Sequence, residues 1–269
     1  MANESQLRKL YLDMVQRCVI NTIYEDPNQG FWAPQVFDSK LRDLGRDWPS
    51  KAHSMIGVRR MSNLRQITEF VVANGIPGDF IETGVWRGGA CIMARAIFKA
   101  YGVQDRRVWV ADSFCGLPRP NPKYAADAND KHYSYPELAI SLDEVKANFA
   151  KYDLLDDQVV FLKGWFSETL AQAPIKSLAV LRLDGDMYES TMDGVVNLYD
   201  KVSTGGYVIV DDFGAVKACQ QAIVDFRASR GIEDPIQNID GIGVFWRKSG
   251  TAQHNLPKST AAAAAPLST

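Results

Sequence analysis

The chain has 269 residues, a formal net charge of −2 and 46% hydrophobic residues, and its four cysteines are widely spaced without a Cys-x-x-Cys pair. This length fits one large domain, the balanced charge does not favour a nucleic-acid or anionic-membrane partner, and the cysteine spacing indicates neither a zinc site nor a disulfide framework. No apolar stretch approaches the ~20 residues that span a bilayer. We therefore expect a cytoplasmic protein, with no nucleic-acid or membrane partner, that binds small molecules or other copies of itself.

The N-terminal part of the chain, residues 1–78, predicts a helical cap that precedes the main sheet. Apolar residues recur at helical spacing over 5–24, which indicates an amphipathic helix that must pack on the core or on a second subunit. Residues 25–54 are rich in Pro, Asp, Gly and Trp, with a short helical pattern over 36–44. This composition is typical of an irregular segment, which could close over a site.

After the cap, strand-like runs alternate with helical patterns, and this alternation indicates βαβ units in a mostly parallel sheet. Strands are expected over 79–85, 107–111, 159–163, 178–183 and 207–210, and helices over 90–101, 141–152, 191–202 and 215–230. The runs 236–239 and 242–247 flank Asp240-Gly241 and predict a β-hairpin, because Asp-Gly favours the tight mirror-image turn. The sequence therefore predicts one α/β domain over 1–248, with a parallel sheet that ends in an antiparallel hairpin.

Two segments fall outside this alternation. Residues 119–141 contain three prolines and many Asp, Asn and Tyr residues, and they follow the second expected strand at the ligand-binding edge. Loops of this length are usually lids or binding loops, so we expect a lid, with a disordered surface insertion as the alternative. Residues 249–269, which include a run of alanines, predict a disordered tail.

A glycine-bearing turn, Gly84-x-x-x-Gly88-Gly89, follows the first expected strand and opens a helix. Glycine lets the backbone bend sharply and lets a ligand approach closely, while the helix start offers free N–H groups. The spacing matches neither a dinucleotide fingerprint nor a phosphate-binding loop. Glu82 in this motif would repel a pyrophosphate but attract a cation, so a sulfonium cofactor with an amino group fits better than a dinucleotide. The alternative is a glycine needed only for tight strand-to-helix packing.

Further candidate cofactor contacts follow the second and third expected strands. Asp112 ends the second strand, where an acid in a doubly wound fold accepts the two hydroxyls of a ribose. A turn or helix-capping aspartate is the alternative. Trp165 and Phe166 follow the third strand and could lie against an adenine ring, although both could equally be core residues.

Two pairs of aspartates stand at the ends of two apolar runs: Asp184 and Asp186 end one run, and Asp211 and Asp212 end the other. Ligands bind at the carboxyl edge of the strands in an open α/β sheet, so the four carboxylates are expected to converge on one site. Crowded carboxylates repel each other, and a hard divalent cation resolves this repulsion.

Taken together, these motifs resemble the macrocin-type O-methyltransferases, which methylate sugar hydroxyls of macrolides and aminocoumarins with S-adenosylmethionine and magnesium. The segments that carry the resemblance are 52–57, 82–90, 110–114, 154–159, 163–166, 181–188 and 210–213. The resemblance covers nearly all of residues 5–248. It implies a class I, Rossmann-like methyltransferase fold with a seven-stranded sheet, lids over the site, a glycosylated small-molecule acceptor and a homodimer.

The resemblance also implies that Asp184, Asp211 and Asp212 bind Mg²⁺. A base must take the proton from the acceptor hydroxyl, and a carboxylate beside the metal can do so. Asp186 and Asp184 are the two catalytic candidates, and the sequence does not decide between them. For Asp186, the alternative is a helix N-cap.

The cofactor site implied by the resemblance and by the loops above includes residues of the cap as well as of the sheet edge. It comprises Met55, Ile56, Glu82, Thr83, Gly84, Val85, Arg87, Gly88, Asp112, Ser113, Phe114, Ser141, Gly164, Trp165 and Phe166. His132 in the expected lid is a third candidate base, but a solvated loop histidine is the simpler interpretation. His53 is expected to make a structural hydrogen bond.

Two other functions are compatible with parts of this pattern. A catechol-type phenolic O-methyltransferase uses a similar metal site but usually has a lysine near the first acidic motif, and residues 185–188 contain none. A non-enzymatic, cofactor-binding protein with this fold would be expected to have lost acidic positions, and all of them are present. The sugar O-methyltransferase is therefore the preferred interpretation.

Overall fold

Among the residues that the structure describes, the central sheet has seven strands in the order β3-β2-β1-β4-β5-β7-β6. The structure is a computed structural model that describes residues 3–30 and 33–250. The strands are β1 (Asp79–Thr83), β2 (Val108–Asp112), β3 (Val159–Lys163), β4 (Leu178–Leu183), β5 (Val202–Val210), β6 (Gln237–Asn238) and β7 (Val244–Arg247). Strands β1 to β5 are parallel, and β7 is antiparallel to both β5 and β6. Because the order reverses between β1 and β4, a crevice is expected at the carboxyl edge of these strands.

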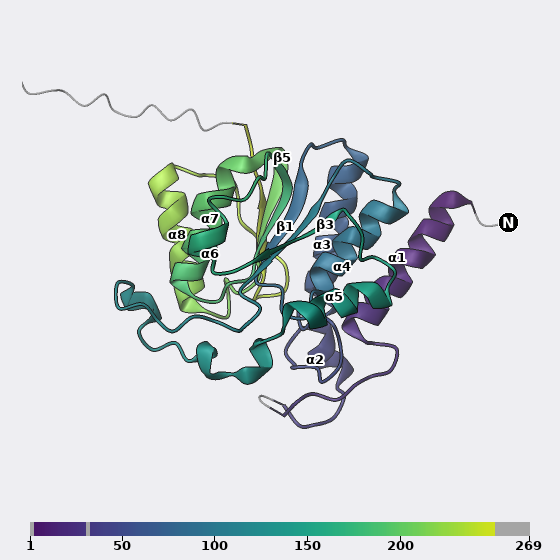
Figure 1. Cartoon of the computed structure of the whole chain (residues 1–269), viewed down its shortest axis with the longest axis horizontal. Helices are drawn as coiled ribbons and strands as arrows, with labels where there is room; N and C mark the ends of the chain where they lie inside the picture. The colour runs from purple at the N-terminus through teal and green to yellow at the C-terminus, as the bar shows by residue number, and fades with distance from the viewer. Residues whose placement is uncertain (1–2, 31–32, 251–269) are drawn as a thin grey trace, which may run out of the picture.

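Helices cover both faces of the sheet, which explains why every residue of the central strand β4 is buried. On one face lie α1 (Glu4–Ile20), α3 (Gly57–Ala73), α4 (Gly89–Ala100) and α5 (Leu142–Lys151), and on the other α6 (Phe166–Thr169), α7 (Tyr188–Leu198) and α8 (Lys217–Arg230) (Figure 1). A cluster of buried apolar side chains fills each interface. The first includes Met61 and Ile92, and the second includes Leu198 and Ile223.

The predicted parallel sheet with an antiparallel end is confirmed, and the expected strands and helices are present with shifted ends. The largest shift is in β5, which begins at Val202 instead of Tyr207. The strand passes through Gly205 and Gly206. Helix α3 falls in the expected cap and was not predicted individually.

The prediction of a tight mirror-image turn at Asp240-Gly241 was wrong. That turn needs a positive φ at both residues, and only Gly241 has one, at 91°. Instead, Ile239 N donates to Gly243 O at 2.9 Å, so the loop is wider. The Asp240 side chain stabilises it by accepting hydrogen bonds from the amides of Ile242 and Gly243 at 3.0 and 2.9 Å.

The irregular cap is held by one buried arginine. Arg42, on the short helix α2 (Ser39–Asp43), forms ion pairs with Asp26 at 3.0 Å and Asp47 at 2.7 Å, and it donates to Ile20 O at 2.8 Å. A second oxygen of Asp26 accepts from the amide of Ala52 at 3.1 Å. These contacts fix the segment before α3 without a regular hydrogen-bond ladder.

Residues 119–141, here called the lid segment, contain three short 3₁₀ turns: η1 (Ala125–Asp127), η2 (His132–Ser134) and η3 (Pro136–Leu138). A fourth, η4 (Tyr199–Lys201), joins α7 to β5. Of the expected tail, residues 251–269 lie outside the described part of the chain. Within the described ranges, each helix is too short or too polar to cross a membrane.

Candidate active site

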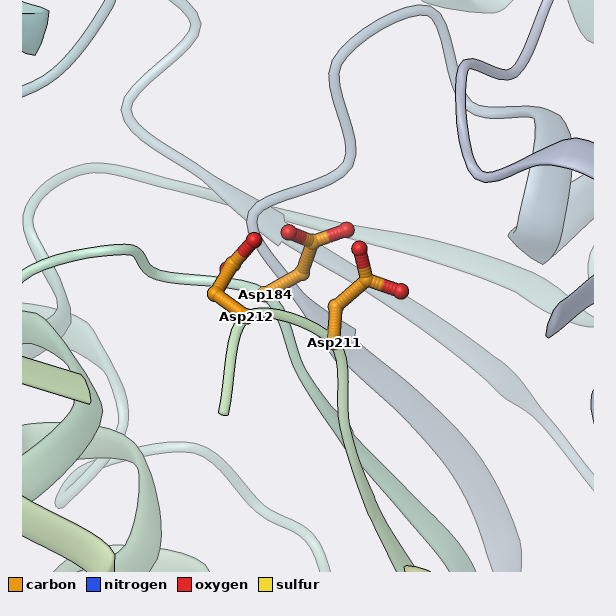
Figure 2. A group of neighbouring side chains, drawn as sticks. All are labelled: Asp184, Asp211 and Asp212. Carbon is orange, nitrogen blue, oxygen red and sulfur yellow. The ribbon is translucent and has the colours of Figure 1, made fainter. Parts of the chain in front are cut away.

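The structure brings together the carboxylates of Asp184, Asp211 and Asp212. Asp184 follows β4, and the other two follow the neighbouring strand β5. The strand ladder continues into the site, because Asp211 N donates to Leu183 O at 2.9 Å. One oxygen from each carboxylate lies within 4.8 Å of the others, and Figure 2 shows the three side chains pointing away from the strand ends. This convergence was expected from the two strand ends.

Arg182 lies beneath this cluster and was not predicted. It is the one charged residue of β4 and is 1% exposed. Its guanidinium donates to Asp184 at 2.5 Å, and also to Asp211 and to Glu82. A buried charge must be paired, so an arginine within an apolar strand indicates partners on adjacent strands. The sequence contained that signal, but the partners depend on register.

A second arginine reaches the cluster from the cap. Arg60 on α3 forms ion pairs with Asp211 and, at 3.1 Å, with Asp240 in the hairpin turn. It also donates to Gly45 O at 3.1 Å. Arg60 therefore ties the cap and the hairpin to the carboxylate cluster. Its place could not be predicted, because 151 residues separate it from Asp211 in sequence.

The three carboxylates suit a magnesium ion. Magnesium prefers oxygen ligands in octahedral geometry at ~2.1 Å, so opposite ligands lie ~4.2 Å apart, and the oxygens of this cluster are compatible with one shared ion. Both Asp211 oxygens accept from arginines, but a carboxylate oxygen has a second lone pair. Burial and then the charges of Asp186 and Asp184 raise the pKa of Asp212 well above its usual range.

Asp186 stands beside the cluster in a left-handed conformation, with φ of 56°. Its amide donates to Asp212 Oδ2 at 3.4 Å. Burial raises the pKa of Asp186 to about 7, the positive charge of His132 opposes the rise, and Asp184 reinforces it. His132 itself pairs through Nδ1 with Asp130 at 2.6 Å, a bond that raises the pKa of His132. A carboxylate with a pKa near 7 is suited to proton transfer near neutral pH.

A cavity of about 1010 Å³ opens above these carboxylates, and the cap, the lid segment and the loops after β1 to β5 all line it. This volume is at the upper end for small-molecule sites and suits two ligands together. The residues that line the cavity include Trp48, Met55, Ile56, Glu82, Gly84, Val85, Asp112, Ser113, Leu117, Asn121, His132, Leu138, Gly164, Trp165, Phe166, Asp184, Asp186, Glu189, Asp193, Asp211, Asp212 and Ile242.

All four predicted aspartates and most of the predicted cofactor residues therefore line this cavity. Five do not: Thr83, Arg87, Gly88, Phe114 and Ser141. Arg87 instead donates to the cap carbonyls of residues 49 and 52, and Ser141 caps α5 through the amide of residue 144. Phe114 packs in the core, and Gly88 and Thr83 lie against neighbouring elements. Because these five residues do not line the cavity, its lining does not support direct contact between them and a cofactor.

Glu82 and Asp112 line the cavity but already accept hydrogen bonds within the protein. Besides Arg182, Glu82 accepts from the thiol of Cys91 at 2.9 Å, and burial raises the pKa of Glu82 to about 7. Asp112 accepts from the amides of Val85 at 2.8 Å and Phe114 at 2.7 Å. Asp112 thus holds the turn after β1 against the loop after β2, and Glu82 joins β1 to α4 and β4.

His53 makes the structural hydrogen bond expected of it. Its Nδ1 lies 2.7 Å from the hydroxyl of Tyr152, which joins the cap to the end of α5. Burial, and then the charges of Lys151 and Arg87, lower the pKa of His53 to about 4. The ring is therefore neutral near pH 7.

Comparison with known proteins identifies the family to which this fold and site belong. The family model described as Macrocin-O-methyltransferase (TylF) matches residues 13–248. The chain belongs to the macrocin-O-methyltransferase family. The predicted family is thus confirmed, and the chain is an O-methyltransferase.

Two characterised relatives of this macrocin-type O-methyltransferase come from Streptomyces. The chain is 50% identical over 256 residues, 94% of this chain and 98% of the relative, to the 8-demethyl-8-(2,3-dimethoxy-alpha-L-rhamnosyl)-tetracenomycin-C 4'-O-methyltransferase of Streptomyces olivaceus. It is also 50% identical over 245 residues, 89% of this chain and 94% of the relative, to the demethyldecarbamoylnovobiocin O-methyltransferase of Streptomyces niveus.

A solved structure supports the same assignment. The structure of the O-methyltransferase NovP superposes on this chain with a TM-score of 0.87 at 50% sequence identity, covering 90% of this chain and 99% of NovP. The class I α/β methyltransferase fold expected from the sequence is therefore confirmed for this member of the family.

Proposed function

We propose that this enzyme transfers a methyl group from S-adenosylmethionine to a sugar hydroxyl of a glycosylated secondary metabolite, with Mg²⁺ bound by Asp184, Asp211 and Asp212. The observation that carries the proposal is the carboxylate cluster at the floor of a cavity large enough for two ligands. Magnesium would supply Lewis-acid chemistry that makes a sugar hydroxyl easier to deprotonate.

Asp186 is the better of the two candidate bases. Asp184 is one of the three proposed metal ligands, and its Oδ2 already accepts a hydrogen bond from Arg182 at 2.5 Å. Asp186 lines the cavity, lies next to the cluster and is not one of the proposed metal ligands, so its carboxylate is free to accept a proton from the acceptor hydroxyl. We assign Asp186 the role of accepting the proton from the acceptor hydroxyl.

The donor is proposed to lie along the loops after β1, β2 and β3. There Gly84 allows close backbone approach, Asp112 offers carboxylate oxygens, and Trp165 offers an aromatic surface. A donor bound there would lie beside the carboxylate cluster, as methyl transfer requires. The enclosing cap and lid segment would exclude water from the reacting atoms.

The names of the relatives support a glycosylated acceptor. The Streptomyces olivaceus relative is named for methylation of a rhamnosyl tetracenomycin at the 4' position, and a third relative, 47% identical over 247 residues, is the mycinamicin III 3''-O-methyltransferase of Micromonospora griseorubida. The first name includes a rhamnosyl group, and both names describe O-methylation. We propose a glycosylated antibiotic precursor as the acceptor, and a homodimer as the assembly. The expected cytoplasmic location stays a prediction.

The decisive test combines a metal-ligand variant with binding measurements. Asp212→Asn keeps the side-chain volume but removes a charge, so kcat for a rhamnosylated aromatic acceptor with Mg²⁺ should fall about 100-fold or more, equivalent to about 2.7 kcal/mol. Calorimetry should show unchanged S-adenosylmethionine affinity. Asp193→Asn is the matched control, because Asp193 also lines the cavity but lies outside the cluster, and it should keep the response to magnesium.

Three outcomes would contradict parts of the proposal. An Asp212→Asn enzyme with wild-type rate and magnesium response would remove the metal assignment. A wild-type enzyme that fails to bind S-adenosylmethionine with or without Mg²⁺ would remove the donor. Efficient methylation of a catechol but of no glycosylated acceptor would favour the phenolic alternative.

A further inference from the structure

Asp127 in the lid segment is fully buried and contacts the helix that follows the catalytic aspartates. Its side chain is 0% exposed, although the surrounding segment is polar. Oδ1 accepts a hydrogen bond from the amide of Tyr188 at 2.7 Å, and Oδ2 accepts one from the amide of Glu189 at 3.0 Å. These are the first two amides of α7.

Helix α7 takes its N-terminal cap from the lid segment. Its own N-cap position is Met187, which has no side-chain oxygen, and among the described residues α7 has no side-chain cap from its own chain neighbours. The first amides of a helix need acceptors, and the helix dipole favours a negative charge at that end. Asp127 meets both requirements from 61 residues away in sequence.

Other contacts attach the lid segment to the same end of α7. Asn121 donates through Nδ2 to Glu189 at 2.9 Å. The ring of Tyr124 lies 5.6 Å from the ring of Tyr188. A buried carboxylate is costly unless it is hydrogen-bonded, so burial of Asp127 depends on this docked arrangement.

The position of α7 matters because the turn before it carries the catalytic groups. Asp184, Gly185 and Asp186 precede Met187 directly, and Asp186 adopts a left-handed conformation that its surroundings must enforce. The lid segment also carries His132, which lines the cavity and whose charge acts on Asp186. Fixing α7 and the lid segment together thus fixes both sides of the proposed base.

We propose that Asp127 is a positioning residue: by capping α7 from the lid segment, it holds that segment over the cavity and orients the turn that carries Asp186. This role rests on the proposed function and adds to it a residue that touches neither donor nor acceptor. Loss of Asp127 should therefore loosen the lid segment and misalign the base while leaving the donor loops intact.

The test compares Asp127→Ala and Asp127→Asn with Asp38→Ala. Asp38 is the matched control, because it caps α2 with the same kind of bonds, to the amides of Lys40 and Leu41 at 2.8 and 3.1 Å, on the exposed surface of the cap. Asp127→Ala should lower kcat ~10- to 100-fold, as small misplacements near reacting groups do. KM for a glycosylated acceptor should rise, and S-adenosylmethionine affinity measured by calorimetry should stay unchanged. Asp127→Asn, which retains one acceptor oxygen, should give an intermediate loss.

Hydrogen exchange provides a readout that does not need turnover. In Asp127→Ala, amide exchange should accelerate over 119–141 and at residues 188 and 189, and remain at the wild-type level in β1 to β5. Asp38→Ala should leave these amides unchanged. If Asp127→Ala does not fold, Asp127→Asn carries the same comparison.

Unchanged exchange of the lid segment, or kinetics of the Asp127 variants that match those of Asp38→Ala, would overturn the proposal. Failure of the proposed function would look different. A wild-type enzyme that transfers no methyl group would contradict the proposed reaction, whereas the exchange comparison would still decide whether Asp127 holds the lid segment on α7.

Discussion

At the scale of single residues, the site depends on very close backbone approaches. The end of β1 passes so near to the turn after β4 that a Cβ built on Gly84 would lie 1.8 Å from Asp184 O. Gly84 also has φ of 85°, a conformation that other residues rarely adopt. The glycine is therefore needed for the carboxylate cluster as well as for a ligand.

Gly84→Ala should destabilise the protein much more than Gly75→Ala. Gly75 has a similar positive φ of 63°, but a Cβ there would meet nothing within 4 Å. Gly75→Ala thus measures the backbone penalty alone, expected at about 1 kcal/mol. Gly84→Ala adds an overpacking penalty of roughly 1–3 kcal/mol or more. Urea unfolding of both variants tests this, and equal losses would show that the backbone at Gly84 relaxes freely.

The sequence predicted the aspartates of the site better than its arginines. Asp184, Asp211 and Asp212 could be grouped because strand ends in a parallel sheet share one edge. Arg182 and Arg60 could not be placed, because their partners depend on strand register and on the docking of α3. Local sequence patterns indicate where strands end, whereas only tertiary packing determines which partners the buried arginines contact.

At the scale of elements, the cap is joined to α5 by a histidine that titrates only at low pH. The folded state holds the pKa of His53 at about 4, below the ordinary value of 6.5. The unfolded chain therefore binds a proton between these pH values when the folded protein does not. Stability contributed through this group is complete above pH 6.5 and is lost as the pH falls toward 4.

In His53→Gln, stability against urea should accordingly fall less than in the wild type as the pH is lowered from 7 to 4.5. Its urea midpoint should lie below that of the wild type at pH 7, where the bond to Tyr152 is lost, and the gap should narrow by pH 4.5. His132→Gln is the informative control, because the pKa of His132 is raised, and its gap from the wild type should widen as the pH falls. A constant gap for His53→Gln at both pH values would contradict the burial of a neutral ring.

Helices and strands were predicted well where the apolar pattern was strong. They were predicted poorly where hydrogen bonds from side chains to the backbone determine the structure. Strands β3 and β4 matched their expected ranges because most of their residues are apolar. The hairpin turn did not match, because the Asp240 side chain bonds to the backbone amides and stabilises a wider loop. The hydrogen bonds from the start of α7 to Asp127 could not be predicted from the local sequence either.

At the scale of the whole molecule, α1 leaves an apolar stripe exposed. Leu7, Leu10, Tyr11 and Met14 recur at i, i+3, i+4 and i+7, and Leu7, Leu10 and Met14 are more than half exposed, at 57%, 61% and 52%. The opposite side of α1 packs on the core, and Figure 1 shows its N-terminal end projecting from the body. Such a face indicates a protein partner.

The spacing of the stripe favours a second copy of the chain as that partner. If two α1 helices pair antiparallel about a two-fold axis, Leu7 lies opposite Met14 and the Leu10–Tyr11 pair lies at the axis, so the stripe is self-complementary. Leu10→Lys would bring two like charges together at that axis, so the variant should sediment as a monomer at concentrations where the wild type is a dimer. Val224→Lys, at a 47% exposed position on α8, is the matched control and should leave the dimer intact. A monomeric wild type in sedimentation velocity, or a dimer that survives Leu10→Lys, would contradict pairing through α1.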